Sequence, residues 1–458
     1  MATAQTHDLI VIGSGMAGLN AAAHAAGLGE RVALVESGMI GGTCPTRGCI
    51  PSKALIRSAE IAHDARRAGE FGIRVGAVAV DMPAVIARVQ AIIRKGSDGA
   101  RAYIESLEAV ELIEAEAAFT APRAVVADGR ELTAPRVIVA SGATATVPPI
   151  PGLDEVPYLT SDDVLFLDHV PGRLVVIGGG PIALELGQAL SRFGSNVTIV
   201  EVLPRLLPDG EPELTEELAG LLADEGIQVL AGATIERVRP GPVVDVVVGG
   251  SARALTADAL LVAAGRAPRV NGLGLEAAGV RMGKKGVDVD HGLRTSAEGV
   301  FAAGDVVGPP YGQFTHVARA MGVAAAANAL DADSHDIDPD AGPRAIFTDP
   351  ELVAIGMTES AAREAGHDVG AATVRFAGGK ARAWGEERGM AKVVVDRRAR
   401  RILGAQILAY HGADLIHPVG VAMAAGDVGL DALLGTMHVH PTLGEKVLAA
   451  AQAAATPS

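Results

Sequence analysis

Two stretches of this chain, far apart in sequence, repeat one pattern that strongly limits how the chain can fold. Each has a short apolar strand, a glycine-rich turn, a helix-forming run and a second strand that ends in glutamate, Glu36 or Glu201. Each glutamate lies 18 residues beyond the last small residue of its turn. Glycines in such a turn let a pyrophosphate approach the backbone at a helix N-terminus, and the glutamate can accept hydrogen bonds from ribose hydroxyls.

The repeat predicts an α/β protein with two Rossmann-like dinucleotide-binding domains, and hence two bound dinucleotides. The first turn follows an apolar strand at residues 9–12, and the second follows one at residues 173–177. The segment that closes the first copy, 139–142, is echoed by 263–266 in the second. The candidate binding residues are the small residues of these segments: Gly13, Gly15, Gly18 and Gly142 in the first copy, and Gly178, Gly180, Ala183 and Gly265 in the second.

The only two cysteines of the chain, Cys44 and Cys49, lie five positions apart in the glycine-rich stretch 41–53. Their spacing does not fit a CxxC motif, and two sulfurs alone cannot close a tetrahedral zinc site. A helix that begins near Cys49 would point its N-terminal amides at the sulfur and favour the reactive thiolate. Two buried structural cysteines are the alternative, but the glycine-rich setting favours a redox pair.

Residues 41–53 read GGTCPTRGCIPSK, which resembles the GGTC-x4-C-x-PSK redox motif of the FAD-dependent pyridine nucleotide–disulfide oxidoreductases. The resemblance extends over nearly the whole chain. The interior of the motif departs from it, because Pro45-Thr46-Arg47 stands where the family usually has an apolar residue, Asn and Val. The resemblance implies that Cys44 is the outer interchange thiol and that Cys49 lies nearer the flavin.

The cysteines also indicate which dinucleotide each domain binds. A disulfide beside the first turn exchanges electrons only with a group lying across it, and nicotinamide alone passes hydride, so a flavin must mediate. The first domain, with Glu36, should then hold FAD, and the second should hold the nicotinamide dinucleotide. Residues 300–305 match the family's strand–Gly-Asp motif, in which the aspartate binds the ribityl chain. Gly304 and Asp305 would therefore complete the FAD domain after an inserted nicotinamide domain.

Two further matches concern the cofactors. Lys53 and Glu185 fit the family's Lys–Glu pair beside the flavin, where a cation near the ring tunes its potential, although an ordinary ion pair is the alternative. Glu201 favours NAD over NADP, because a carboxylate accepts from a free 2′-hydroxyl and repels a 2′-phosphate. Relatives that use NADPH carry arginines just after this strand; Arg205 lies nearby but follows Pro204. We expect FAD and NAD as cofactors and no metal.

The last part of the chain changes character. Residues 346–352, 392–395 and 402–408 predict antiparallel strands, and residues 414–425 predict a helix. This α+β region resembles the family's dimerisation domain, and His440 and Glu445 fit its HP-x3-E pattern. A histidine can exchange protons with a thiol near neutral pH, and a glutamate fixes its tautomer. The resemblance implies a homodimer in which His440, oriented by Glu445, serves the active site of the partner subunit.

The order of these motifs predicts four segments. They are an FAD-binding domain (first part, 1–148), an NAD-binding domain (149–272), a second part of the FAD-binding or central domain (273–342) and a dimerisation domain (343–458). The net charge of -15 argues against nucleic acid or an anionic membrane as a partner. The first apolar run is too short for a signal sequence, and no run of 18 apolar residues occurs, so we expect a cytoplasmic protein.

Within the family, the resemblance is strongest to the dihydrolipoamide dehydrogenases, which implies NAD-dependent oxidation of a small dithiol or of a lipoyl domain. Reduction of another low-molecular-weight disulfide, of the glutathione or mycothione type, is the enzymatic alternative. The middle of the chain is closer to mercuric reductases, but those need a C-terminal cysteine pair, and no cysteine follows Cys49. A non-catalytic flavoprotein electron carrier would not need the pair His440 and Glu445.

Overall fold

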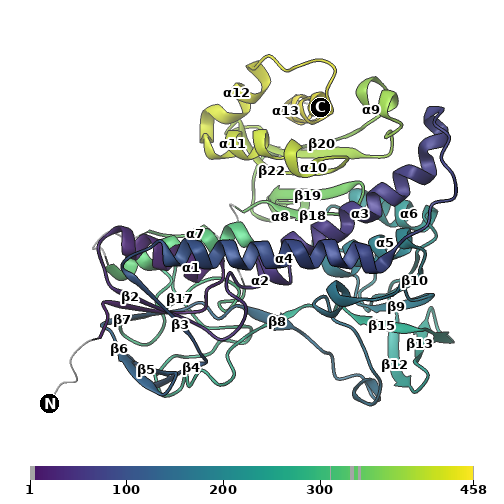
Figure 1. Ribbon diagram of the computed structural model, residues 1–458. Helices are drawn as coiled ribbons and strands as arrows, with labels where there is room; N and C mark the ends of the chain where they lie inside the picture. Colours follow the sequence, from purple (N-terminus) through teal and green to yellow (C-terminus); the bar gives the residue numbers. More distant parts are fainter. Residues whose placement is uncertain (1–5, 310, 331–334, 339–341, 457–458) are drawn as a thin grey trace.

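The computed structural model describes residues 6–309, 311–330, 335–338 and 342–456. The N-terminal part is built on a five-stranded sheet with the order β17-β7-β1-β2-β3, in which every neighbouring pair is parallel (Figure 1). Strands β1, β2 and β17 are buried along their whole length, as expected for a parallel sheet covered on both sides, whereas the edge strand β3 is partly exposed. The bounds are β1 (Leu9–Ile12), β2 (Val32–Glu36), β3 (Val110–Glu114), β7 (Arg136–Val139) and β17 (Val300–Ala302).

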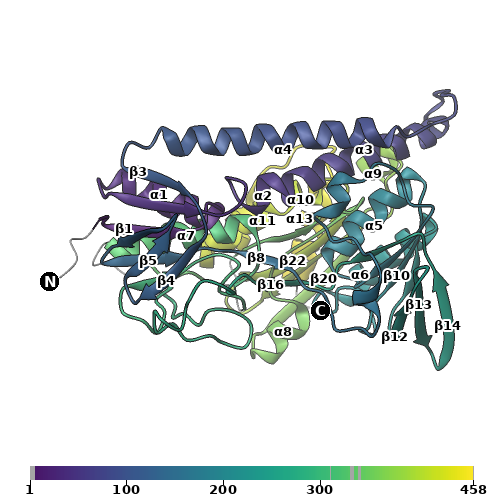
Figure 2. The same ribbon diagram turned by 60° about the horizontal axis from the view of Figure 1, so that its bottom comes forward.

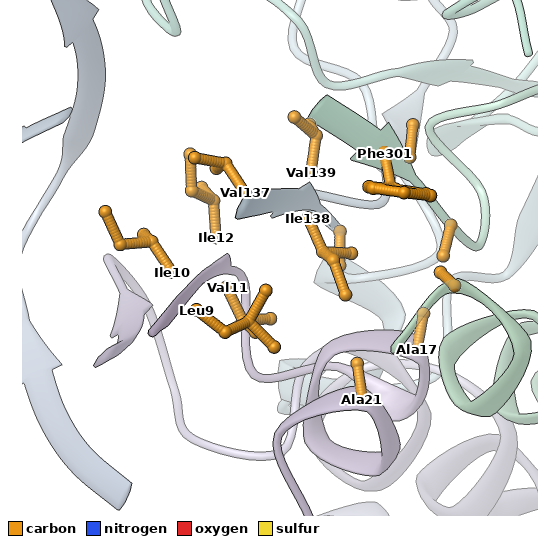
Figure 3. Packing of buried hydrophobic residues seen from close by; sticks show 14 of the residues in the cluster. Leu9, Ile10, Val11, Ile12, Ala17, Ala21, Val137, Ile138, Val139 and Phe301 are labelled. Carbon is orange, nitrogen blue, oxygen red and sulfur yellow. The ribbon is translucent and has the colours of Figure 1, made fainter. Parts of the chain in front are cut away.

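Two alanine-rich helices, α1 (Met16–Gly27) and α7 (Thr315–Leu330), pack against each other beside this sheet. A Cβ atom at Gly322 would lie 2.0 Å from the backbone oxygen of Ala17, so the helices meet backbone to backbone. Figure 3 shows the side chains of Val11 and Ile138 extending from the sheet toward α1. Strand β17 follows the second glycine-rich unit in the sequence and pairs with β7. The chain therefore returns to the first sheet after the second unit.

The second glycine-rich unit forms a four-stranded parallel sheet with the order β11-β10-β9-β15. One face packs against helices, and the other packs against a three-stranded antiparallel sheet. The bounds are β9 (Arg173–Ile177), β10 (Asn196–Val200), β11 (Gln228–Leu230), β15 (Ala259–Val262), α5 (Pro181–Phe193), α6 (Pro212–Asp224), β12 (Thr234–Arg239), β13 (Val243–Val248) and β14 (Ser251–Thr256).

The two units are joined by short strands and covered by long helices. β8 (Ala143–Ala145) and β16 (Arg266–Pro268) pair antiparallel and connect the closing segments of the two copies. In Figure 2, α4 (Met82–Glu105) runs along one side of both units. Beneath it lie α2 (Thr43–Thr46) and α3 (Cys49–Arg67), and a small antiparallel sheet, β4 (Ala117–Ala121), β5 (Ala124–Ala127) and β6 (Arg130–Thr133), flanks the first unit.

The C-terminal part is a five-stranded antiparallel sheet with the order β18-β19-β22-β21-β20, covered by short helices. The strands are β18 (Arg344–Ile346), β19 (Glu351–Gly356), β20 (Val369–Arg375), β21 (Met390–Asp396) and β22 (Arg401–Ala409). The helices are α8 (Glu359–Glu364), α9 (Gly379–Trp384), α10 (Gly412–Leu415), α11 (His417–Ala424), α12 (Gly429–Gly435) and α13 (Gly444–Ala455).

Two sequence-based predictions in this part are wrong in detail. The strand predicted at 346–352 is split into β18 and β19, because Pro350 cannot donate to a ladder and Thr348 bonds the Pro350 carbonyl in a turn. The helix predicted at 414–425 is split into α10 and α11, with Pro418 in the first turn of α11, where its missing N–H is tolerated.

The predicted fold class, with two Rossmann-like units and an α+β C-terminal domain, is confirmed. The domain boundaries stay predictions. Among the described residues, none of the helices combines the length and apolar character that a membrane crossing requires.

Candidate active site

A cavity of about 810 Å³ lies where the two units and the C-terminal domain meet. It is lined by the first glycine-rich turn, the cysteine loop, the turn after β17, the first turn of α5 and residues next to β18. Ten residues predicted from the sequence line it: Gly13, Gly15, Glu36, Cys44, Cys49, Lys53, Gly142, Glu185, Gly304 and Asp305. The other eight do not line it: Gly18, Gly178, Gly180, Ala183, Glu201, Gly265, His440 and Glu445.

The glycines of the first turn serve two purposes. Gly13 has a φ of 107°, and a Cβ there would lie 2.3 Å from the Ala140 oxygen, so this position requires glycine for the fold itself. Gly18 is equally tight, with 1.8 Å to the Gly13 oxygen. At Gly15, by contrast, a Cβ would meet only the Gly42 Cα, at 4.0 Å. The free space at Gly15 opens on the cavity, which fits close approach of a pyrophosphate.

The acidic residues of the first unit also fit FAD. Glu36 Oε2 accepts hydrogen bonds from the Ser14 N–H and hydroxyl, both at 2.8 Å, and Oε1 accepts from the Gly38 N–H at 2.8 Å. These bonds hold the carboxylate at the cavity wall, where a ribose would lie. Burial raises the pKa of Asp305, and no side-chain hydrogen bond joins it to any other described residue. A hydroxyl-bearing chain in the cavity would provide the missing partner.

The second unit repeats the local geometry. Gly178 has a φ of 109°, a Cβ there would lie 2.5 Å from the Ala263 oxygen, and Ala183 is fully buried. Gly180 has no neighbour that a Cβ would meet, so its turn is open to a ligand. Glu201 Oε2 accepts from the Gly179 N–H at 2.6 Å, and Oε1 accepts from the Leu203 N–H at 2.7 Å.

Arg205 is already engaged by its own loop. Its guanidinium donates to the Thr215 hydroxyl at 2.9 Å and to the Gly210 carbonyl at 3.0 Å, and it also bonds Pro208 O. Arg205 therefore has fewer donors available for a 2′-phosphate. Gly142 and Gly265, with φ of 74° and 106°, have open space where a Cβ would stand, and Gly304, at 77°, packs closely on Ala17.

The cysteines lie on the consecutive short and long helices α2 and α3. Helix α3 begins at Cys49, as the sequence predicts, so its N-terminal dipole favours the Cys49 thiolate. Cys49 Sγ lies 3.1 Å from Thr315 Oγ1, and both cysteines are free thiols. The Cys44 thiol lowers the pKa of Cys49 to about 6 by hydrogen bonding, and Thr315 and Lys53 act in the same direction. The pKa of Cys44 is raised, chiefly by its hydrogen bond with Cys49.

An ion pair connects the two units beside the cavity. Lys53 Nζ, from α3, lies 2.8 Å from Glu185 Oε2, on α5. The Lys53 ammonium also lies 4.3 Å from the centre of the Phe347 ring, and the Phe347 N–H donates to Glu185 Oε1 at 3.0 Å. The Glu185 side chain is only 9% exposed. Glu185 therefore holds the cation and the aromatic ring in place at the cavity.

His440 and Glu445 form the expected pair, but they lie outside the cavity of their own chain. His440 Nδ1 is 2.9 Å from Glu445 Oε1, and the Thr442 N–H donates to Glu445 Oε2 at 2.9 Å. The Thr442 bond and, second, His440 lower the pKa of Glu445. The His440 side chain is 79% exposed and does not line the cavity of its own chain.

Sequence reasoning missed two residues of this site. Thr315 contacts Cys49 from the start of α7, and Phe347 covers Lys53 from the segment after β18. A hydroxyl residue at the start of the alanine-rich helix was the available signal for Thr315. Phe347 has no such signal, because its contact depends on how the C-terminal domain packs against α3 and α5.

Comparison with known proteins agrees with this geometry. A family profile described as pyridine nucleotide-disulphide oxidoreductase matches residues 7–323, and the profile of that family's dimerisation domain matches residues 342–451. A dihydrolipoyl dehydrogenase of Chlorobaculum tepidum is 38% identical, with 97% of this chain and 96% of the relative covered. A mercuric reductase of Bacillus cereus is 36% identical, with 96% of this chain and 70% of the relative covered.

Among solved structures, the Cu(II) complex of an HOCl-induced flavoprotein disulfide reductase of Escherichia coli has a TM-score of 0.86 to this chain at 29% identity. The alignment covers 98% of this chain and 99% of that one. The chain belongs to the pyridine nucleotide–disulfide oxidoreductase family of FAD- and NAD(P)-dependent enzymes.

Proposed function

We propose that this enzyme is an NAD-dependent dithiol/disulfide oxidoreductase of the dihydrolipoyl dehydrogenase type, which oxidises dihydrolipoyl groups through Cys44 and Cys49. The observation that carries the proposal is that both cysteines share one cavity with the glycine-rich turn of the first nucleotide unit and with the start of α5 in the second unit. The relatives named dihydrolipoyl dehydrogenase, 38% identical at best among those described, support the same substrate class.

In the oxidised enzyme the two sulfurs form a disulfide. One thiol of the substrate, as its thiolate, attacks Cys44 Sγ, the sulfur–sulfur bond breaks, and Cys49 leaves as a thiolate. The second substrate thiolate then attacks the substrate sulfur of the mixed disulfide and releases Cys44, so the substrate becomes a disulfide and the enzyme gains two electrons. The lowered pKa of Cys49 makes it the better leaving group. Bound FAD would take these two electrons from the dithiol and pass them to NAD as hydride.

The chain's other residues hold groups or move protons in this scheme. Glu36, Asp305 and the open Gly15 hold FAD along the first unit, and the Lys53–Glu185 pair fixes a positive charge beside it. Glu201 binds the ribose hydroxyls of NAD, and the engagement of Arg205 by its own loop supports NAD over NADP. His440 accepts the substrate thiol protons, and Glu445 stabilises the resulting imidazolium.

We propose that His440 acts on the cavity of a second subunit in a homodimer. Its exposure and its position outside its own cavity support this arrangement. Several of the most exposed large apolar side chains lie in the dimerisation domain, which supports burial there by a partner: Val421, Val428, Met437 and Val439.

The subunit arrangement can be tested with mixed dimers of Cys44→Ser and His440→Ala chains. Each parent homodimer should be nearly inactive. Random co-expression makes about half of the dimers mixed, and in each of these one site keeps both intact groups, so roughly a quarter of the unmutated activity should return. No recovery, with mixed dimers demonstrated by mass, would rule out action between subunits.

The substrate assignment requires a direct comparison. The purified enzyme should be assayed with dihydrolipoamide and NAD, and in reverse with lipoamide, glutathione disulfide and mycothione against NADH and NADPH. We expect kcat/KM for the lipoyl substrate to exceed the others by at least about a hundredfold. Greater activity on another disulfide would assign the enzyme to that substrate. Hg(II) and Cu(II) should be included, because a mercuric reductase is a close relative and a structural relative was solved with Cu(II).

A further inference from the structure

The interior of the cysteine loop departs from the family pattern at three consecutive residues, and two of them have structural roles. The Pro45 ring fills the space beside two glycines, because a Cβ at Gly41 would lie 2.9 Å from Pro45 Cγ and a Cβ at Gly96 would lie 3.0 Å from Pro45 Cβ. The buried Thr46 donates its hydroxyl to the Gly42 carbonyl at 2.6 Å. Both residues stabilise the loop that carries Cys44.

The third residue, Arg47, has no such role. Its side chain lines the cavity, and its Nε is buried without a hydrogen-bond partner among the described residues. No carboxylate of the described residues lies within ion-pair distance of its guanidinium. A buried guanidinium donor without a partner is costly, so a ligand is expected to satisfy it.

The position of Arg47 indicates which part of a ligand it meets. A Cβ atom at Gly38 would lie 3.4 Å from Glu36 Oε1 and 3.5 Å from Arg47 Nη2, so the carboxylate and the guanidinium face the same small space. Glu36 marks the adenosine end of the first nucleotide unit. The first turn, which faces the pyrophosphate in this fold, donates the Ser14 N–H to the same Glu36 carboxylate.

We propose that Arg47 is an additional FAD-binding residue that donates to the ADP part of the cofactor, with the pyrophosphate oxygens as its principal acceptors. A planar guanidinium matches phosphate oxygens in a bidentate geometry, and it carries a charge opposite to theirs. Arg47 thus acts on cofactor retention, and the choice of disulfide substrate does not depend on it. The family's usual valine at this position cannot make this contact.

The test measures FAD affinity in the full-length apoprotein and does not depend on the disulfide substrate. Arg47→Val should raise the Kd for FAD about 10- to 100-fold, because a hydrogen bond to a charged group is lost, and Arg47→Lys should recover part of it. Arg74→Val, at an exposed arginine outside the cavity, is the matched control and should leave Kd unchanged. An unchanged Kd for Arg47→Val would overturn the proposal.

Two further measurements separate binding from a structural role. ADP and adenosine serve as competing probes: Arg47→Val should weaken ADP binding as much as FAD binding, and adenosine binding by less than threefold. The melting temperature of the apoprotein should not fall, because Arg47→Val removes a buried donor that has no partner there, whereas that of the FAD-bound protein should fall. Equal losses for ADP and adenosine, or equal falls of both melting temperatures, would overturn the assignment to phosphate. If Arg47→Val does not fold, the same test can be made with Arg47→Gln, which keeps a polar side chain but removes the positive charge and the bidentate donor geometry of the guanidinium.

Discussion

The two nucleotide-binding units of this enzyme are nearly identical in local geometry and very different in their surroundings. In each, one glutamate oxygen accepts from a turn N–H, Ser14 or Gly179, and the other accepts from an N–H two residues after the glutamate. In each, the first glycine has a φ near the same value, 107° and 109°. The local sequence therefore determines one nucleotide site twice.

What differs is the structure that the rest of the chain brings to each turn. The first unit receives the cysteine loop, the Asp305 turn and the start of α7, so its glycine-rich turn shares the cavity with two thiols. The second receives α3 and the segment that follows β18, and it contributes to the shared cavity through the start of α5, Ser161 and residues of the segment 266–272. The strand, glycine-rich turn and glutamate of each unit thus select a dinucleotide. Elements distant in the sequence select the chemistry that is done with it.

The largest effect should come from adding one methyl group to each first glycine. Gly13→Ala and Gly178→Ala both force a positive φ on alanine and bring its Cβ within 2.5 Å of a carbonyl, costing about 1–3 kcal/mol for strain and as much again for overpacking. Gly13→Ala should lose FAD and all activity. Gly178→Ala should retain FAD and lose at least about tenfold in kcat/KM for NAD.

FAD content, melting temperature and NAD kinetics measure this contrast. Gly27→Ala, at a helical glycine with open space, is the control and should behave as the unmutated protein. Loss of FAD from Gly178→Ala would show that the two units are not independent.

A smaller effect is expected from removing the charge of Glu201 or of Glu36, and only the Glu201 variant should change the preference between NAD and NADP. Glu201→Gln keeps one acceptor for a backbone N–H and removes the charge that repels a 2′-phosphate, so it should narrow the preference for NAD over NADP about tenfold. The corresponding Glu36→Gln should weaken FAD binding and leave the nicotinamide preference unchanged. Steady-state kinetics with both nicotinamides measure the ratio. Equal use of NAD and NADP by the unmutated enzyme would contradict the role of Glu201.

Much of this comparison is predictable from the sequence, because the relevant signals are local. The strands predicted at 9–12 and 173–177 coincide with β1 and β9, since glycines and apolar runs delimit them sharply. Helix α5 begins at Pro181, directly after the second glycine-rich turn, because proline suits the first helical turn. The ten cavity-lining residues named from motifs belong to the same class of local signals.

The remainder depends on tertiary packing. The antiparallel sheets β4–β6 and β12–β14 have short strands whose partners are set by the units that they cover. Thr315 is separated from Cys49 by 266 residues, and Phe347 comes to Lys53 from another domain. Neither contact leaves a periodic or spaced pattern in the sequence. Arg47 is predictable only in part. The sequence shows that it departs from the family motif, but only the structure shows that its side chain lies near Glu36.

The thiols give a pH-dependent signal that only the first unit should show. With a pKa of about 6, Cys49 in the reduced enzyme is a thiolate above that pH and is protonated as the pH falls through it. Anaerobic two-electron reduction should therefore produce a long-wavelength charge-transfer absorption with FAD that fades with a midpoint near pH 6. Thr315→Val should move the midpoint upward, because it removes a donor to the thiolate.

Cys49→Ser should abolish this absorption while FAD stays bound. Cys44→Ala should retain a Cys49 thiolate whose midpoint lies higher, because the Cys44 hydrogen bond is the main cause of the low pKa and alanine has no donor. Retention of the band in Cys49→Ser would assign the flavin contact to Cys44 instead.

The smallest effect concerns the contact that joins the two units. Lys53 comes from the first unit's cysteine helix and Glu185 from the second unit, and the Phe347 ring lies 4.3 Å from the ammonium. Phe347→Leu keeps the backbone bond to Glu185 and most of the apolar volume but removes the π face. Because the Lys53 side chain is 31% exposed, the lost cation–π interaction should cost only about 0.5–1 kcal/mol.

A double-mutant cycle separates the cation–π interaction of Lys53 with Phe347 from the effect of losing the Lys53–Glu185 ion pair. The free energies of unfolding of Lys53→Met, Phe347→Leu and the double variant should show a coupling of about 0.5–1 kcal/mol, and Lys53→Met alone should cost more, since it leaves Glu185 buried without its cation. Hydride transfer from NADH should slow only two- to fivefold in Phe347→Leu, in line with about 0.5–1 kcal/mol. Strict additivity would show that Phe347 only fills space and that the cation–π contact adds nothing to the Lys53–Glu185 ion pair between the two units.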